Sequence, residues 1–356
     1  MSTNTPEQPI RILFLAPMTR IAMRHYLQAL LDETAGDDFD VMVVAPSHTD
    51  VNTRREIRRF QGGHKFLVLL AQINPLTYWK IAKAIRDFRP DVVNTINGDN
   101  RPMAVWAAWM ARRAGASSVL TIHDPVPHPD AWLHRLTDWI GAIAARASDA
   151  LALHSSYYLK EVETKFRKPT FVFGLPDFTA AYPKAPLPQK EDLVLFFGRV
   201  EQYKGIDNFV SLGKRLAGRA RFLLAGAGDI GADLEQQMAQ RPDIFQVENR
   251  FVPDDELVAM LDRAKVVIMP YHSATQSGIP AAAVSRGAYP IGFAVGGLAE
   301  QLPEFGGIAV PAADMDALAA SVETTLALPL SSFETLRENK PGFGAALRGM
   351  LRSIVG

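Results

Sequence analysis

The chain has 356 residues, too many for one ordinary domain and about right for two. Apolar residues make up 48% and charged residues 21%, and the absence of cysteine excludes disulfides, thiolate nucleophiles and cysteine-ligated zinc. A net charge of zero argues against a nucleic-acid-binding protein. Residues 1–9 are polar, and no uncharged apolar run reaches the roughly 18–20 residues that span a bilayer. We therefore expect a loose N-terminal tail and a cytoplasmic protein.

Short apolar runs recur along the first half of the chain. They lie at 11–16, 41–45, 66–70, 92–96, 119–123 and 150–153, and most are separated by stretches compatible with amphipathic helices. Continuous apolar strands that alternate with helices indicate a parallel sheet covered on both faces. The pattern predicts an N-terminal Rossmann-like domain over residues 1–181.

A second α/β domain is predicted after a linker. Residues 182–192 contain three prolines and several charges, as interdomain linkers do. Apolar runs resume at 193–198, 221–225, 244–247, 266–269, 289–293 and 308–310, which predicts a domain over 193–335. We expect residues 336–356 to form a C-terminal helix that returns to the first domain. The predicted fold is α/β, with two Rossmann-like domains facing across a cleft.

The neutral total hides a charge difference between the halves. Residues 1–185 hold 22 Lys and Arg against 18 Asp and Glu, so they carry +4 and the remainder −4. Part of the excess is a basic cluster whose i,i+4 spacing predicts one helix face. A solvated helix face is one interpretation, and contact with an acceptor or an anionic membrane is the other. The candidate residues for that contact are Arg54, Arg55, Arg58, Arg59, Tyr78 and Trp79.

Ligands of open parallel sheets bind beyond the carboxyl ends of the strands, where helix N-termini present free N–H groups. The first segment in such a position contains Gly198, Arg199 and Lys204. Glycine allows the backbone to approach a ligand, Arg binds two phosphate oxygens at once, and Lys adds a point charge. Taken alone, the segment is also compatible with a solvated loop.

The second segment follows the run 266–269. Pro280 suits the first turn of a helix, so the N–H groups just before it are expected to face outward at the positive end of the helix dipole. A simple helix cap is the alternative. The candidate ligand-binding residues of this segment are Gln276, Ser277, Gly278 and Ile279.

The third segment follows the run 289–293. Its Gly296-Gly297 pair permits close approach, and Glu300 is suited to accept hydrogen bonds from sugar hydroxyls. A further glycine turn at Gly226 and Gly228 is more typical of a tight turn than of a phosphate site. Together, the three segments indicate that a diphosphate binds the second domain.

These residues resemble a known family. Gly198-Arg199-x4-Lys204-Gly205, the Gln276-Ser277-Gly278 turn and Gly296-Gly297-x-x-Glu300 are similar to the second domain of GT-B glycosyltransferases, specifically family 4. The similarity covers about 190–305 well and the first domain weakly. It implies transfer of a sugar, expected to be a hexose, from a nucleotide diphosphate sugar, with the donor in the second domain and the acceptor in the first. Arg199 and Lys204 would hold the donor pyrophosphate.

The resemblance also assigns a role in the first domain. His123 ends a strand at a place where many family members carry a histidine that faces the donor sugar, so it would align donor with acceptor. A His-Asp pair that only caps the strand is the alternative. The sequence departs from the family where two glutamates are usual, since Thr275 and Ala283 stand there. The usual glycine pair after the first strand is also missing, because Ala16–Arg20 takes its place.

The resemblance implies a retaining reaction on one face of the sugar, without a protein nucleophile, a metal or another cofactor. Arg199, Lys204 and the turn at 277–279 would stabilise the leaving diphosphate. Two DxD sequences, Asp38–Asp40 and Asp314–Asp316, lie in polar connections, and we do not expect them to bind metal. The expected acceptor is a saccharide or a lipid-linked saccharide in polysaccharide or glycoconjugate biosynthesis, with peripheral binding at the inner face of the cell membrane.

Two other functions fit the same features. A nucleotide-sugar epimerase of this architecture would convert the donor without an acceptor. A binding-only relative would bind nucleotide sugars without transfer, which the two missing carboxylates would explain. Hydride transfer is disfavoured because the first strand is not followed by G-x-G-x-x-G.

Overall fold

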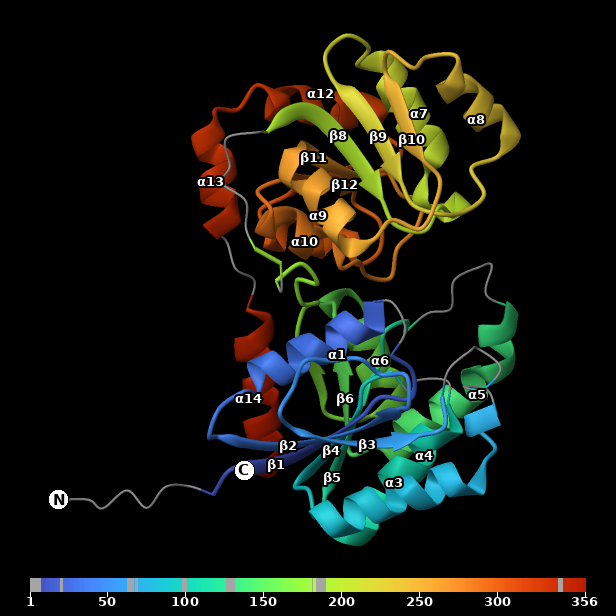
Figure 1. The fold of residues 1–356 in the computed structure, drawn as a ribbon, viewed down its shortest axis with the longest axis vertical. Helices are drawn as coiled ribbons and strands as arrows, with labels where there is room; N and C mark the ends of the chain where they lie inside the picture. Colours follow the sequence, from blue (N-terminus) through green and yellow to red (C-terminus); the bar gives the residue numbers. More distant parts are fainter. Residues whose placement is uncertain are drawn as a thin grey trace, which may run out of the picture. The chain divides into compact units, whose positions relative to one another are not determined.

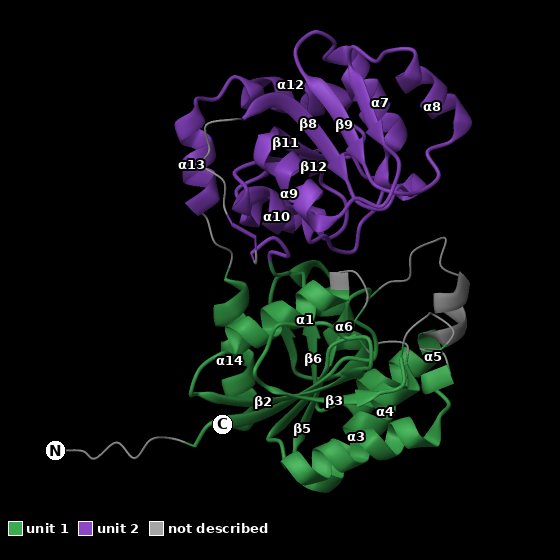
Figure 2. Ribbon diagram, viewed as in Figure 1, with its two compact units in different colours: residues 1–176, 342–356 green, residues 177–341 purple. Residues whose placement is uncertain are grey.

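The computed structural model describes residues 8–19, 22–62, 67, 70–97, 101–125, 132–180, 182–183, 190–338 and 342–356. The chain forms two compact units, residues 1–176 with 342–356 and residues 177–341 (Figure 2). Each unit is built on one parallel sheet covered by helices (Figure 1). The predicted α/β class with two Rossmann-like domains is confirmed.

The sheet of the first unit has seven parallel strands in the order β3-β2-β1-β4-β5-β6-β7. The order reverses beside β1, which pairs with β2 on one side and β4 on the other. The strands are β1 (Ile10–Leu15), β2 (Phe39–Pro46), β3 (Glu56–Phe60), β4 (Val92–Thr95), β5 (Ser117–Thr121), β6 (Ala150–Leu153) and β7 (Thr170–Val172).

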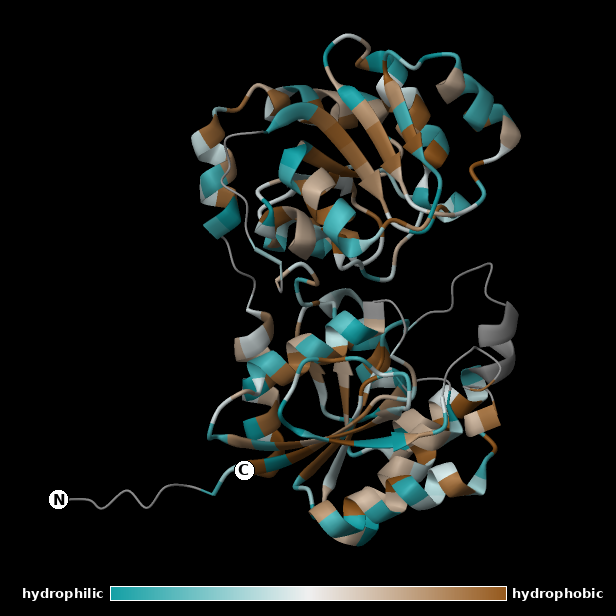
Figure 3. Cartoon of the chain, viewed as in Figure 1, coloured by the Kyte–Doolittle hydropathy of each residue, from teal (hydrophilic) through white to brown (hydrophobic). Residues whose placement is uncertain are grey.

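Both faces of this sheet are buried, which explains its continuous apolar strands. In β1, Ile12 and Phe14 pack into one core, whereas Leu13 and Leu15 pack into another on the opposite face. Figure 3 shows central strands that are mostly apolar, a hydrophilic edge strand β3, and helices that are apolar on one side. The helices are α1 (Ala22–Glu33), α3 (Pro75–Phe88), α4 (Pro102–Ala114), α5 (Trp132–Ala147) and α6 (Leu159–Phe166).

The second unit has a six-stranded parallel sheet in the order β10-β9-β8-β11-β12-β13. Its strands are β8 (Glu191–Phe197), β9 (Arg221–Ala225), β10 (Phe245–Glu248), β11 (Ala264–Met269), β12 (Tyr289–Phe293) and β13 (Ile308–Val310). Its helices are α7 (Ile206–Arg215), α8 (Ala232–Ala239), α9 (Asp254–Arg263), α10 (Ile279–Ser285), α11 (Leu298–Glu304), α12 (Met315–Leu326) and α13 (Leu330–Glu338).

The six apolar runs of the second half all became strands, but the first half differs from its prediction. Strands β3 and β7 are additional. The run 66–70 was expected to be a strand, yet Leu67 is helical, and so is Leu70. A short run that is apolar throughout carries no period to separate helix from strand. The remaining residues of that run lie outside the described residues.

The last helix, α14 (Phe343–Val355), belongs to the first unit (Figure 2). Phe343, Leu347 and Leu351 are buried in the same core as β1 and α1. Arg352 also pairs with Asp38 at 2.7 Å. The chain therefore returns to its first unit after completing the second, and this helix covers apolar surface of the first sheet.

Removing a side chain of this helix from the core should destabilise the first unit. Leu347 is fully buried, so we expect Leu347→Ala to lower the free energy of unfolding by about 2–5 kcal/mol. All five tryptophans lie between residues 79 and 139, so their fluorescence reports unfolding of the first unit. Ser353→Ala, at an exposed position of the same helix, should change stability by less than about 0.5 kcal/mol. Equal unfolding curves for the two variants would contradict this packing.

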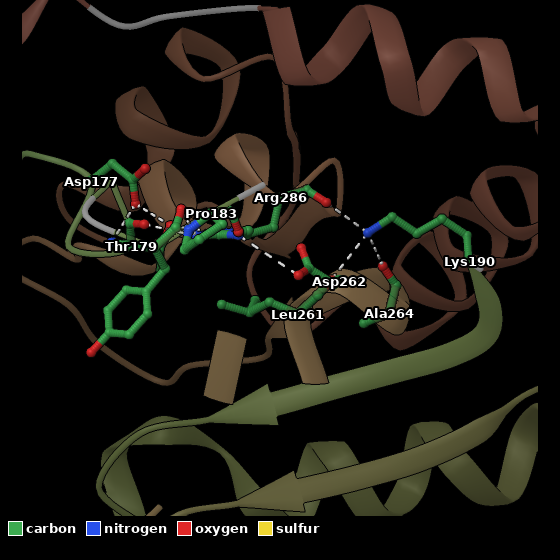
Figure 4. Close-up of polar contacts among 9 residues, drawn as sticks. Asp177, Thr179, Pro183, Lys190, Leu261, Asp262, Ala264 and Arg286 are labelled. Carbon is green, nitrogen blue, oxygen red and sulfur yellow. Dashed lines mark hydrogen bonds and ion pairs between the residues drawn. The ribbon is translucent and has the colours of Figure 1, made fainter. Parts of the chain in front are cut away.

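The units divide between Pro176 and Asp177, ahead of the predicted linker. The physical reason is Arg286, a fully buried residue just after α10. Its guanidinium donates to the carbonyl oxygens of Thr179 at 2.7 Å, Tyr182 at 3.0 Å and Pro183 at 2.8 Å (Figure 4). These hydrogen bonds hold Thr179, Tyr182 and Pro183 on the second unit.

A second cation fastens the other described end of the same segment. Lys190 donates to the carbonyl oxygens of Leu261, Ala264 and Arg286 at 2.8–3.0 Å (Figure 4). Burial lowers the pKa of its ammonium to about 7. Strand β8 then begins at Glu191, within the predicted linker. The described residues on both sides of 184–189 are thus bound to the second unit.

Candidate functional site

The three segments singled out in the second half lie at the carboxyl ends of β8, β11 and β12, and hydrogen bonds join them. His272 donates its backbone N–H to the Tyr203 carbonyl at 2.7 Å, which joins the first segment to the second. Gly297 donates in the same way to Ala274 at 3.2 Å, which joins the second to the third. We predicted from the sequence that these segments converge, and the fold brings them together.

Glycines allow these loops to approach each other. A Cβ added at Gly205, where φ is +68°, would lie 1.9 Å from the Pro270 carbonyl oxygen. At Gly226, where φ is +149°, it would lie 1.9 Å from the Gly198 carbonyl oxygen. Only glycine fits such backbone contacts. The Gly226 turn therefore serves packing between loops, as the tight-turn interpretation held.

Lys204 is the most distinctive residue of the site. It ends the short 3₁₀ turn Gln202–Lys204, and only 9% of it is exposed. Within the described ranges its ammonium makes no hydrogen bond or ion pair, and the ring of Tyr271 lies 5.7 Å away. Burial lowers the pKa of Lys204 to about 8. A buried cation without a partner is unfavourable, and an anionic ligand would satisfy it.

Gly198 provides the space beside this ammonium. A Cβ at Gly198 would lie 3.1 Å from Lys204 Nζ and 3.9 Å from Ile279 Cδ1. Lys204 and Ile279, predicted from different segments, therefore border the same glycine. With φ at +113°, the position also strongly favours glycine.

Arg199 has a different environment. Its side chain is 74% exposed and pairs with Glu201 at 2.8 Å. The predicted pair of phosphate-binding cations therefore consists of a buried lysine without an ion pair among the described residues and an exposed arginine that has one. The environment of Lys204 therefore favours binding of an anion more strongly than the environment of Arg199 does.

The turn at 277–279 is only partly open, which corrects the expectation of three outward-facing amides. Ser277 donates its N–H to the Gln301 side-chain oxygen at 2.9 Å. Ile279 donates to Ser277 Oγ at 3.2 Å. Among the described residues, the Gly278 N–H meets no acceptor. Gln301, which the sequence analysis missed, is one residue beyond Glu300 and carries no motif signal of its own.

Other predicted donor residues border the same loops. Gln276 is half-buried with its Oε1 unpartnered, Gly297 is buried, and Glu300 is exposed. Ala283, at the position where a carboxylate is usual in the family, is fully buried in the core between the sheet and α10. No carboxylate could be accommodated there without disrupting the core.

In the first unit, His123 lies just beyond the carboxyl end of β5 and is 8% exposed. Its Nε2 donates to the Ile96 carbonyl at 2.6 Å. The ring packs against His154, with centroids 4.7 Å apart, and edge-on against Tyr26 at 5.0 Å. Burial lowers the pKa of His154 to about 3, so this neighbour is neutral. The imidazole of His123 is thus held in a fixed orientation.

A side chain replaces the missing glycine pair after β1. Asn97, which is 6% exposed, accepts the Met18 N–H at 3.3 Å and donates back to the Met18 carbonyl. Thr19 and Thr49 share a hydrogen bond of 2.6 Å. The loop at 16–19 is therefore fixed by polar contacts with neighbouring strand ends, while Arg20 lies outside the described residues.

The basic cluster does not form a helix face, so that prediction is wrong. Residues 56–60 are strand β3, which puts Arg58 and Arg59 on opposite faces of the sheet. Arg58 pairs with Asp87 at 2.8 Å, Arg59 donates to the Thr49 carbonyl, and Arg55 donates to the Gly36 carbonyl. Strand pairing with β2 overrides the i,i+4 pattern. Of the nearby aromatics, Tyr78 is half-buried and Trp79 is 54% exposed.

An apolar groove lies elsewhere in the first unit, between α4 and α5. It encloses about 450 Å³. Trp109, Trp139 and Ile143 line it and remain 39%, 62% and 42% exposed. Arg112 also lines it, and the Arg113 guanidinium lies 3.7 Å from the Trp109 ring centroid. Tyr78, one of the residues predicted for acceptor or membrane contact, also lines the groove, whereas its other lining residues were not predicted.

The DxD carboxylates have structural partners. Asp38 pairs with Arg352, Asp40 with Arg11 and Asp316 with Arg215. Asp314 caps the N-terminus of α12. None of the helices that the structure describes is both long and apolar enough to cross a membrane.

Two family models match the chain, one for each unit. Residues 23–172 match the model described as Glycosyltransferase Family 4. Residues 191–327 match the model described as Glycosyl transferases group 1. No curated protein sequence matches.

Solved structures share the fold over nearly the whole chain. Sucrose-phosphate synthase from Thermosynechococcus elongatus is 18% identical, with a TM-score of 0.66 over 97% of this chain and 96% of its own. HepE from Anabaena, solved with UDP, is 14% identical, with a TM-score of 0.68 over 97% and 99%. Trehalose-phosphate synthase from Burkholderia xenovorans, solved with glucose-6-phosphate, is 14% identical, with a TM-score of 0.66 over 97% and 100%. The chain is a glycosyltransferase of the GT-B type, in which the first unit matches the Family 4 model and the second unit matches the group 1 model.

Proposed function

We propose that the protein transfers a hexosyl group, with retention and without a metal, from a nucleotide diphosphate sugar bound at the Lys204 site. The observation that carries this proposal is the buried ammonium of Lys204, which makes no hydrogen bond or ion pair with the described residues and lies beside Gly198. A diphosphate would supply the missing negative charge. Because charge builds up on the leaving diphosphate, the same ammonium would stabilise the transition state.

The neighbouring groups support a role in donor binding. The Gly278 N–H, which meets no acceptor in the described part of the chain, and the Gln276 amide border the same loops, and Glu300 suits sugar hydroxyls. HepE, similar in fold, was solved with UDP-glucose, which favours a uridine nucleotide for the first test. In the first unit, the fixed imidazole of His123 is proposed to align the transferred sugar.

The experiment is a donor panel of UDP- and GDP-sugars, each with and without crude lipid extract or oligosaccharides. We expect one donor to release nucleoside diphosphate only when an acceptor is present. Conversion of the donor sugar without an acceptor would instead support an epimerase. Calorimetric binding without any turnover would support a binding-only relative. Loss of activity on prolonged treatment with chelator would contradict the metal-independent proposal.

We further propose that the acceptor is a saccharide carried on a lipid and presented at the inner face of the cell membrane. Apolar side chains that remain exposed in the α4–α5 groove, namely Trp109, Trp139 and Ile143, suit contact with acyl chains, and the neighbouring Arg112 suits an anionic headgroup. Such a surface fits a lipid-linked acceptor better than it fits a fully polar one. Sedimentation with vesicles checks this. We expect binding to vesicles containing phosphatidylglycerol, weaker binding to phosphatidylcholine alone, and release at high salt. If the protein binds neither kind of vesicle, the lipid-linked acceptor is contradicted and a soluble saccharide is the remaining acceptor.

The pKa of Lys204 makes donor binding dependent on pH. A bound diphosphate favours the protonated ammonium, whereas the free protein releases this proton with a pKa of about 8. We therefore expect donor affinity to decline as the pH rises above about 8. A titration of the affinity between pH 6 and pH 10 in wild type and Lys204→Arg checks this, because an arginine stays charged across that range. A decline of the same size in both proteins would assign the effect to another group.

A further inference from the structure

Gln301 occupies an unusual position for a polar side chain. It lies on α11 and is 1% exposed. Its side-chain oxygen accepts the N–H of Ser277 at 2.9 Å. At such a depth water does not compete for the hydrogen bond, so the bond holds the Ser277 backbone in place.

This hydrogen bond fixes the turn that borders Lys204. Ser277 Oγ accepts the N–H of Ile279 at 3.2 Å, and the Ile279 side chain borders Gly198 beside the lysine ammonium. A displaced Ser277 would therefore move the Ile279 side chain that borders Gly198 beside Lys204 Nζ. The Gln301 side chain links the third predicted segment to this turn.

The other half of the amide is unsatisfied. Gln301 Nε2 is buried and has no hydrogen-bond partner in the part of the chain that the structure describes. The same is true of Gln276 Oε1, on the residue next to Ser277. The two segments that the Gln301–Ser277 hydrogen bond connects thus contain one unpaired donor, Gln301 Nε2, and one unpaired acceptor, Gln276 Oε1, among the described residues. Buried polar groups are usually paired, and exceptions are frequent at functional sites.

We propose that Gln301 is a positioning residue for the diphosphate of the donor, an inference that rests on the donor function proposed above. Its amide oxygen fixes the Ser277–Ile279 turn against Lys204. Its neutrality matters as well, because a carboxylate would accept the same hydrogen bond but repel the diphosphate.

Two substitutions separate these roles. Gln301→Glu keeps an acceptor for Ser277 but adds a negative charge, while Gln301→Met removes the acceptor and adds none. Gln236→Glu, at an exposed position of α8, is the control for the added charge. The measurements are the affinities for UDP, GDP and inorganic pyrophosphate by calorimetry, the unfolding temperature, and kcat and KM with the active donor.

We expect Gln301→Glu to weaken diphosphate binding by at least about tenfold, because like charges repel. It should also lower the unfolding temperature, because the carboxylate replaces an amide at a position that is only 1% exposed. Gln301→Met should weaken it by roughly 3- to 10-fold, the loss expected for one hydrogen bond. Gln236→Glu should bind as wild type does. Wild-type affinity and KM in Gln301→Glu would overturn the proposal, even with a lowered unfolding temperature, since that result marks a purely structural residue. Failure of wild type to bind any of the three probes would instead overturn the donor function itself.

Discussion

Replacing Lys204 with methionine is expected to reduce kcat/KM for the donor by roughly 10- to 150-fold, which corresponds to the about 1.5–3 kcal/mol of one charge-assisted hydrogen bond. Methionine has nearly the same length, so the pocket beside Gly198 stays filled while the charge is lost. Calorimetry with nucleoside diphosphate should show a loss of similar size. Wild-type binding and turnover in this variant would refute the assignment of the diphosphate site.

Arg199→Met is the matched control, because both cations were predicted from one loop. The Arg199 side chain is 74% exposed and pairs with Glu201, so its contact with a ligand is screened by water and must compete with that carboxylate. We expect a decrease of less than about fivefold. The double variant should then resemble Lys204→Met. A larger effect of Arg199 than of Lys204 would show that the loop rearranges on binding.

Lys204→Met should also leave the protein more stable. The folded state lowers the pKa of Lys204 to about 8 from its ordinary value of 10.5, so the unfolded chain binds more protons between these values and stability rises with pH there. Below about pH 8 the folded state carries the full penalty of the buried charge. The gain in unfolding temperature from the substitution should therefore be larger at pH 7 than at pH 10. The penalty marks a site where stability is given up for binding.

The second large effect is expected at Arg286. Arg286→Met should lower the stability of the second unit by about 3–5 kcal/mol, because it breaks the buried ion pair with Asp262 and leaves three buried carbonyl groups without their donor. The second unit has no tryptophan, so circular dichroism should show an earlier transition while tryptophan fluorescence keeps its wild-type midpoint. Coincident shifts of both signals would mean that the units unfold together.

Arg263→Met is the control for Arg286. Arg263 forms a two-point ion pair with Glu191, but 41% of its side chain and 44% of the glutamate's are exposed. Exposed pairs contribute about 1 kcal/mol or less. A loss as large as that of Arg286→Met would show that charge, rather than burial of the carbonyl groups, determines the effect.

The sequence by itself determined the fold class and the place of the site. Strands buried on both faces must be apolar throughout, so Ile12 to Leu15 and Val194 to Phe197 were readable as strands of parallel sheets. Parallel strands bring their carboxyl ends to one edge, so Gly198, Ser277 and Gly297 could be predicted to lie together. Both inferences depend on features that are local in the sequence, namely the alternation of apolar strands with helices and the residue types in the loops that follow the strands.

Only the tertiary structure decided the environment of each side chain. Lys204 and Arg199 are cations of the same short loop, yet Lys204 is buried without an ion pair among the described residues, whereas Arg199 is exposed and pairs with Glu201. The arginines at 54–59 have helix spacing, but pairing with β2 makes residues 56–60 a strand. Gln301 acquires its role from Ser277, which lies 24 residues earlier. Burial and partnership depend on residues distant along the chain, and no local pattern encodes them.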